Sequence, residues 1–263
     1  HGCQSGGESP LPLEGVVITL VGILFIKMRR HNWGLRGVSF ALALMLTASV
    51  VGEVHAQACN PYTISDGTPV YWTIPRIALE VDDDLPEGID TQAWLRIVED
   101  SLSPWTSLDC LLWEVEVIDQ GFSPCPGEIV DDERQCIYWV NSDESWPFSS
   151  WQLAVTLVHY RTDNGHIVDT DMALNGTGTF DWSLAEQCDP EGEQHDLQAT
   201  LTHEFGHLLG LDHSSTAQAT MSGTTREADC IKRSLHETDI SCLCETMNAH
   251  PRPWLEQTDT SPP

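Results

Sequence analysis

Hydrophobic and polar residues alternate along the middle of the chain in a way that predicts β-strands. Residues 111–119 place Trp113, Val115 and Val117 around Glu114 and Glu116, which is the period of a strand with one buried face. Other short apolar runs end at proline, glycine or turn residues and predict further strands. These runs cover residues 70–75, 135–140, 151–160 and 165–174.

Three other segments have the periodicity of amphipathic helices. The first covers residues 88–108, and we expect it to stop at Pro104 because proline has no backbone N–H to donate. The second follows Asp196, a residue type that caps helix N-termini, and runs through residues 197–210. The third covers residues 235–247.

The order of these elements predicts an α+β fold in a single domain. Strands with one early helix come first, residues 176–195 are an expected loop, and two helices follow. Hydrophobic residues make up 41% of the 263-residue chain and charged residues 20%, which is ordinary for a globular domain.

Two apolar stretches precede this domain and indicate export. Residues 16–26 are too short to predict a membrane span with certainty, although a membrane anchor there is the alternative. A basic segment beginning at Met28 is followed by an apolar run and by small residues at Ala56 and Ala58, as in a secretory signal peptide. We therefore expect secretion and the following division: an upstream segment 1–27, a signal peptide 28–58, a folded domain 59–250 and a flexible tail 251–263.

The charge of the chain excludes two classes of partner. Its 40 acidic residues against 12 basic residues give a formal net charge of −28. Such a surface repels nucleic acid and anionic membranes, so neither is an expected partner.

Cysteines support an exported protein. The chain has nine, and eight remain when Cys3 is removed with the leader, which allows up to four disulfides with an open pairing. The alternative is a cysteine zinc site, prompted by Cys242 and Cys244, but it requires reduced thiolates.

The helix at 197–210 carries titratable residues at the spacing of a metal site. His203 and His207 are four residues apart, so a helix places both imidazoles on one face, where they can share a Zn²⁺ ion. Glu204 lies beside the metal without being forced to bind it, and can deprotonate a water that zinc activates.

A catalytic zinc needs a third protein ligand. Gly210 follows His207 by three residues, at a position where helices commonly end with a positive φ. The chain can turn there and return His213 to the metal. The complete pattern is His-Glu-x-x-His-x-x-Gly-x-x-His over residues 203–213.

This pattern resembles the zinc signature of the metzincin metallopeptidases. The sequence HEFGHLLGLDHS is similar to the matrixin (matrix metalloproteinase-like) branch. The sequence GHIVDTDMALN, at 165–175, resembles the strand before the active-site helix in bacterial-type matrixins. Met221 follows His213 in the sequence ATMS, where the resemblance implies a methionine turn beneath the zinc. The resemblance further implies a metzincin-like catalytic domain, with a twisted, mostly parallel mixed sheet of about five strands and three helices.

The activity implied by the resemblance is that of a monomeric zinc endopeptidase acting on polypeptides. Glu204 would be the general base and then the general acid. The substrate would pair as an added strand with the sheet edge at 153–159. The expected substrate-binding residues there are Leu153, Ala154, Val155, Thr156 and Leu157.

Several features of the matrixin pattern are absent or open. The latency motif of animal matrixins is missing, and residues 222–227 replace the Pro-x-Tyr expected after the methionine turn. His159 and His166 are candidates for a second, structural zinc, with a simple hydrogen-bonded role as the alternative. Calcium is a further candidate ligand, for the carboxylates of Asp163, Asp169 and Asp171.

The sequence is also compatible with two other functional hypotheses. One is a catalytically silent metzincin-fold domain that binds other proteins or serves in adhesion. Retention of Glu204 argues against it, because zinc binding alone does not require that side chain. The other is a membrane-tethered protease, which requires that residues 1–27 are part of the protein.

Overall fold

A computed structural model describes residues 2–5, 60–111, 113–119 and 134–250, all within one compact unit. The expected anchor or upstream segment at 16–26, the signal peptide at 28–58 and the tail at 251–263 lie outside the described residues. None of the helices described is both long enough and apolar enough to cross a bilayer.

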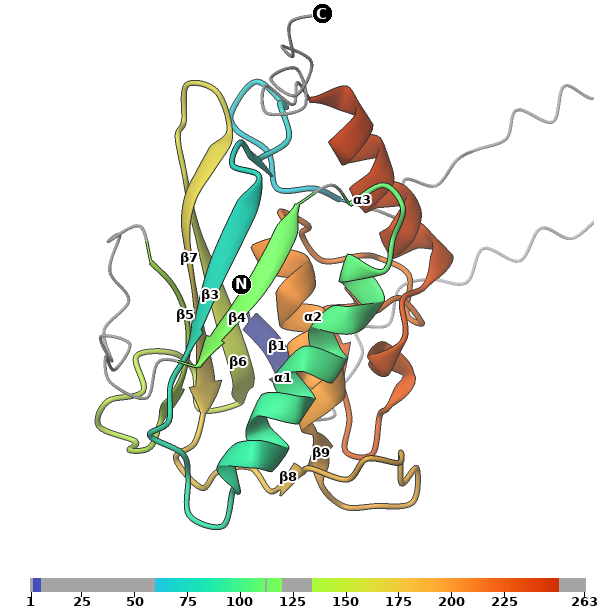
Figure 1. The fold of residues 1–263 in the computed structure, drawn as a ribbon. Helices are drawn as coiled ribbons and strands as arrows, with labels where there is room; N and C mark the ends of the chain where they lie inside the picture. Colours follow the sequence, from blue (N-terminus) through green and yellow to red (C-terminus); the bar gives the residue numbers. More distant parts are fainter. Residues whose placement is uncertain (1, 6–59, 112, 120–133, 251–263) are drawn as a thin grey trace, which may run out of the picture. The chain divides into compact units, whose positions relative to one another are not determined.

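Five longer strands form the main part of the sheet (Figure 1). They lie in the order β6, β7, β5, β3, β4, and all neighbours are parallel except the antiparallel pair β6 and β7. The predicted α+β fold with a mostly parallel sheet is therefore confirmed. The strands are Arg76–Val81 (β3), Glu114–Asp119 (β4), Gln135–Val140 (β5), Gln152–Tyr160 (β6) and His166–Asn175 (β7).

Short strands extend this sheet beyond β6. Gly2–Ser5 (β1) pairs antiparallel with β6 and parallel with Thr224–Thr225 (β10). In the structure the sheet edge predicted at 153–159 is covered in part, because β1 pairs with residues 152–155 of β6 and β10 lies beyond β1. Trp182–Ser183 (β8) pairs with His195–Asp196 (β9) in a separate two-stranded sheet inside the expected loop.

The prediction of a strand over residues 70–75 is wrong for most of this segment. Of residues 70–75 only Tyr71–Trp72 (β2) forms a strand, and β3 begins directly after Pro75. Side chains alternate along β3, with Ile77, Leu79 and Val81 buried, so its pattern was present in the sequence although no strand was predicted there.

Three α-helices follow the predictions closely: Thr91–Thr106 (α1), Leu197–Leu208 (α2) and Glu237–Ala249 (α3). Contrary to expectation, α1 continues past Pro104. A proline in the last turn removes only one late hydrogen bond, and Ser107 N–H still donates to the carbonyl of Ser103 at 3.0 Å. Between α2 and α3 lies a short 3-10 helix, Ile231–Arg233.

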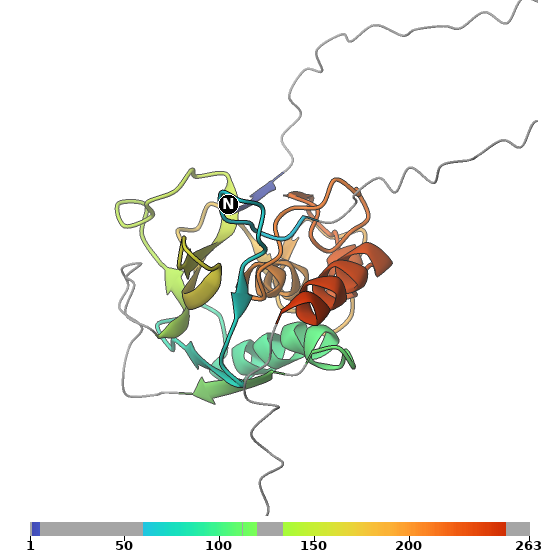
Figure 2. The ribbon, with the colours of Figure 1, turned by 90° about the horizontal axis from the view of Figure 1, so that it is seen from above.

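Helices α1 and α2 pack together on one face of the sheet (Figure 1, Figure 2). Two buried tryptophans outside α2 donate indole hydrogen bonds to backbone carbonyls of this helix. Trp105 Nε1 donates to the carbonyl of Thr202 and Trp72 Nε1 to that of Leu208, each at 2.8 Å. The apolar face of α2 is completed by Leu201 and Phe205, both fully buried.

Disulfides join distant parts of the chain. Cys110 is bonded to Cys244, and Cys188 to Cys230. Cys136 and Cys242 each take part in a further disulfide bond. The alternative of a zinc site at Cys242 and Cys244 is therefore wrong, because neither is a free thiolate.

Candidate metal centre

The structure brings together the three histidines of the sequence pattern. One nitrogen each of His203, His207 and His213 lies within 4.8 Å of the other two. Their ring centroids are 4.8 to 5.2 Å apart. In the described part of the chain, no other group of three His, Cys, Asp or Glu residues converges in this way.

Hydrogen bonds orient two of these rings. His203 Nδ1 lies 2.6 Å from the carbonyl oxygen of Thr220, and His207 Nδ1 lies 2.7 Å from that of Leu211. A carbonyl only accepts, so each Nδ1 carries the proton and each Nε2 keeps a free lone pair. His203 Nε2 is buried without a hydrogen-bond partner among the described residues. His207 Nε2 faces His213 Nε2 at 3.3 Å.

Burial keeps the three imidazoles neutral. It is the largest cause that lowers the pKa of His207 to about 3 and that of His203 well below its usual value. Burial also lowers the pKa of His213. Three neutral imidazoles with converging lone pairs are the donor set of a zinc site, so the residues present fit a Zn²⁺ ion.

The predicted turn after α2 exists. Gly210 has a φ of +96°, and a Cβ there would lie 2.8 Å from the carbonyl oxygen of Val70, so only glycine fits. The returning chain is held by Asn60, whose carbonyl accepts from Asp212 N at 2.6 Å and whose side-chain amide donates to His213 O at 3.2 Å.

Met221 lies where the resemblance placed a methionine turn. Its side chain is buried against Gly206 of α2. Gly206 lies between His203 and His207 in the sequence. Its carbonyl accepts from Ser214 N at 2.7 Å, which ties this turn to the segment that carries His213.

A substitution at Gly206 tests this packing. We expect Gly206→Ala to lower the free energy of unfolding by about 1–3 kcal/mol, the usual cost of overpacking a core. The new Cβ would overlap Met221 Sδ and would lie 3.0 Å from Trp105 Cζ2. Urea unfolding measures the change, and Gly178→Ala, in open space at the protein surface but with positive φ, gives the cost of backbone strain alone. A smaller loss at Gly206 than at Gly178 would contradict the packing.

Glu204 stands between the helical histidines and is fully buried. Its Oε2 accepts a hydrogen bond from Thr156 Oγ1 on β6 at 2.7 Å. Thr156 is among the five residues predicted to bind substrate, and in the structure it orients this carboxylate. The other four predicted residues also lie on β6, where Ala154 and Val155 pair with β1.

The sequence analysis missed several residues that support the centre. Asp239 of α3 is buried and accepts from Thr220 N at 2.7 Å, which holds the carbonyl that orients His203. Lys232 is also buried, donates to the carbonyl of Ser222, and lies 3.5 Å from His203 Nδ1. Tyr62 places its hydroxyl 3.0 Å from His207 Nδ1. No local sequence signal marks Lys232 and Tyr62, because each acts on a distant segment. Asp239 is also the third residue of the capping box of α3, which is a local signal for the helix start but not for the contact with Thr220.

The secondary metal candidates do not assemble within the described residues. His166 Nε2 lies 3.0 Å from the hydroxyl of Tyr71, and His159 Nδ1 lies 3.6 Å from Asp169. The hydrogen-bonded alternative thus describes His166. Neither these histidines nor Asp163 and Asp171 belong to a converging ligand group in that part of the chain.

Comparison with known protein families identifies the family of this chain. The sequence model of the family described as Matrixin matches residues 37–246, which include the whole of α2 and all three clustered histidines. No curated protein matches the chain.

Proposed function

The chain belongs to the matrixin family, and from that premise we propose that it is a zinc-dependent endopeptidase. One observation carries the proposal. Three neutral imidazoles converge beside a buried glutamate that a threonine of the neighbouring strand orients. Matrixins are zinc-dependent peptidases, and His203, His207 and His213 would hold the ion here.

Held by His203, His207 and His213, a zinc ion would supply Lewis acidity to the scissile carbonyl and to the attacking water. Glu204 takes a proton from that water and passes it to the departing amine, first as general base and then as general acid. The hydrogen bond from Thr156 Oγ1 occupies Oε2 and fixes the orientation of the carboxylate while it does so. The carbonyls of Thr220 and Leu211 keep the protons on the Nδ1 atoms of their histidines.

We place the peptide substrate alongside β6, where backbone hydrogen bonds can bind it as an added strand. The pairing of β1 supports this position. Gly2–Ser5 runs antiparallel to β6, with Gly2 opposite Val155, and parallel to Thr224–Thr225. A peptide strand in the position and direction of β1 would therefore meet backbone groups of β6 on one side and of β10 on the other. Leu153 to Leu157 are then the expected contacts.

We also infer that the mature protein is exported as a monomeric catalytic domain over residues 59–250. Disulfides persist in oxidising compartments, and Cys110–Cys244 and Cys188–Cys230 are of this kind. The acidic chain suits a soluble exported domain. Nucleic acid and membranes stay outside the proposed set of partners.

Removal and return of zinc tests the function. We expect the purified protein to cleave unstructured polypeptides, to lose this activity on dialysis against a chelator, and to regain it when one equivalent of zinc is added. Hydrolysis of a quenched fluorescent peptide library and metal analysis measure both. A zinc-loaded protein that cleaves no peptide would favour the silent binding domain, and a zinc-free protein that still cleaves would contradict the mechanism.

A further inference from the structure

Lys232 is a buried cation in a chain that has few cations. It is the only lysine after Lys27, and the whole chain holds 12 basic residues against 40 acidic ones. Its side chain is only 1% exposed, although lysine is almost never fully buried unless its charge is paired. Because removal of an ammonium group from water is costly, contacts inside the protein must compensate for the burial of this one.

The ammonium group lies between the metal centre and the segment that follows Met221. Its Nζ donates a hydrogen bond to the carbonyl oxygen of Ser222 and lies 3.5 Å from His203 Nδ1. That Nδ1 already donates to the carbonyl of Thr220, so the acceptor for the ammonium is the carbonyl of Ser222. A hydrogen bond from a charged donor is stronger than one between neutral groups, so Lys232 fixes this carbonyl firmly.

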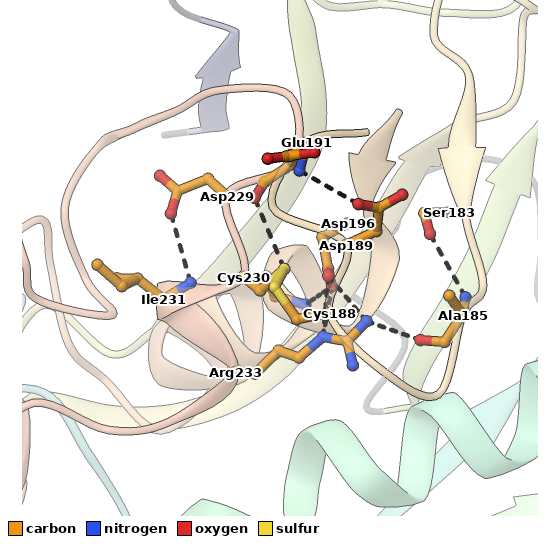
Figure 3. The surroundings of a disulfide bond; sticks show 12 residues. Ser183, Ala185, Cys188, Asp189, Glu191, Asp196, Asp229, Cys230, Ile231 and Arg233 are labelled. Atoms are coloured by element: carbon orange, nitrogen blue, oxygen red, sulfur yellow. Dashed lines mark hydrogen bonds and ion pairs between the residues drawn. A yellow bond between two sulfur atoms is a disulfide. The ribbon is translucent and has the colours of Figure 1, made fainter. Parts of the chain in front are cut away.

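The 3-10 helix that carries Lys232 is itself held at both ends (Figure 3). Cys230, directly before it, is bonded to Cys188. Arg233, its last residue, donates from Nε to both carboxylate oxygens of Asp196 at 3.0 and 2.9 Å. Asp196 is the N-cap of α2, so these contacts tie the short helix to the helix that carries two of the metal-centre histidines. Lys232 therefore reaches Ser222 from a fixed backbone.

The carbonyl that Lys232 holds belongs to the turn leading into β10. Gly223 comes next, and a Cβ at this residue would lie 2.9 Å from His213 Nδ1, so the chain lies directly against the metal centre here. Thr224–Thr225 (β10) follows at once. The distance between β10 and the centre thus depends on a short backbone segment that Lys232 fixes.

Backbone pairing shows which part of a bound peptide β10 would meet. Gly2 of β1 lies opposite Val155 of β6, and β10 pairs with the C-terminal half of β1. Thr156, next to Val155, is the residue that orients Glu204. A peptide in the position and direction of β1 therefore passes Glu204 first and β10 afterwards. Its residues on the C-terminal side of the scissile bond are the ones that would pair with β10.

We propose that Lys232 is a positioning residue for substrate binding, which fixes the Ser222 carbonyl and thereby sets the place of β10 beside the peptide. The proposal rests on the proposed endopeptidase function and adds to it the pairing of the residues after the scissile bond. The ammonium group is buried and touches neither the peptide nor the reacting atoms. Its loss should therefore raise KM and leave kcat unchanged.

The test compares Lys232→Met with the wild type on one peptide and on versions of it that are N-methylated at single backbone nitrogens after the scissile bond. Methionine has a similar length but offers no N–H group. For the unmodified peptide we expect KM to rise about tenfold, which corresponds to about 1.4 kcal/mol, with kcat and zinc content unchanged. At a nitrogen that faces β10, N-methylation should raise KM in the wild type and have little effect in Lys232→Met, because that pairing is already lost. Nitrogens that face β6 should keep their penalty in both proteins.

Arg96→Met is the matched control, because it removes a cation from the exposed side of α1 and should change none of these quantities. An unchanged KM in Lys232→Met would overturn the positioning role and leave the endopeptidase standing. The same holds if every N-methyl penalty survives the substitution, or if the substitution lowers zinc content, which would assign Lys232 to the metal centre instead. Failure of the wild type to cleave any peptide would overturn the proposed function and the positioning role together.

A second measurement does not depend on the folding of Lys232→Met. Since Lys27 and Lys232 are the only lysines, the Lys27→Arg protein labelled with ¹³C at lysine Cε gives a single NMR signal. In the zinc-loaded protein that also carries Glu204→Gln, a saturating amount of the uncleaved peptide should shift this signal, because the peptide pairs with the strand that Lys232 positions. A signal that stays in place at saturation would contradict the positioning role.

Discussion

Replacement of Glu204 by glutamine is expected to lower kcat by about 10²–10⁴-fold, the usual contribution of a general base, while the zinc content stays unchanged. Glutamine has nearly the same shape, and its carbonyl oxygen can still accept the hydrogen bond that Thr156 Oγ1 gives to Glu204 at 2.7 Å. It cannot take a proton from water. The converging ligand group comprises three histidines without Glu204, so metal binding should not need this carboxylate.

The measurement combines kcat on a fluorogenic peptide with metal analysis of the same sample. Glu237→Gln, on the exposed first turn of α3, is the matched control and should keep full activity. Wild-type kcat in the Glu204→Gln variant would mean that another group is the base. Loss of zinc from that variant would mean that Glu204 is a ligand, which contradicts the division of roles between the carboxylate and the imidazoles.

The parts of the centre that local spacing determines could be predicted from the sequence. His203 and His207 share a helix face because they are four residues apart, and Gly210 permits the turn that returns the chain. The start of α2 was also predictable, because Asp196 accepts from Ala199 N at 2.8 Å as a helix N-cap does. Each of these features depends on residues only a few positions apart.

Contacts between distant segments could not be predicted in the same way. Thr156 and Glu204 are 48 residues apart, and their hydrogen bond exists because α2 packs beside β6. Asp239 reaches Thr220 across 19 residues and thereby fixes the carbonyl that orients His203. Hydrophobic patterning predicts which faces are buried, but it does not say which buried polar groups will meet.

Errors in the predicted elements have similar physical causes. Pro104 ends a helix only when its missing N–H and its ring conflict with a continuing turn, and in α1 the helix ends two residues later anyway. The strands β1 and β10 are short segments: β1 pairs with backbone groups of β6, and β10 pairs with β1. Neither has enough residues to show a period of its own.

The arrangement around the centre makes the metal site rigid before any ion binds. Two orienting carbonyls belong to the turns after α2 and before Met221, and both turns are fixed by further hydrogen bonds, to Asn60 and to Asp239. Ligands held in this way lose little conformational entropy on binding. Removal of one ligand should therefore damage zinc affinity without unfolding the domain.

The second large effect is accordingly expected for His213→Ala. This substitution should weaken zinc binding by more than about 100-fold, the upper end of what loss of an outer-shell partner costs, and should abolish peptide hydrolysis. His203 and His207 remain as a two-nitrogen site, which is one protein ligand short of a catalytic zinc centre. The fold should survive, since His213 is only partly buried and lies outside any helix or strand.

His166→Ala supplies the control and separates two metal hypotheses. His166 hydrogen-bonds Tyr71 at 3.0 Å and belongs to no converging ligand group among the described residues. Its loss should leave one zinc per chain and full activity, whereas His213→Ala should leave none at the same free zinc concentration. Isothermal titration with zinc and circular dichroism of each variant decide between binding and folding effects. If His166→Ala lost a second equivalent of zinc, a structural zinc site would exist. If His213→Ala bound zinc as tightly as the wild type, the three-histidine centre would be wrong.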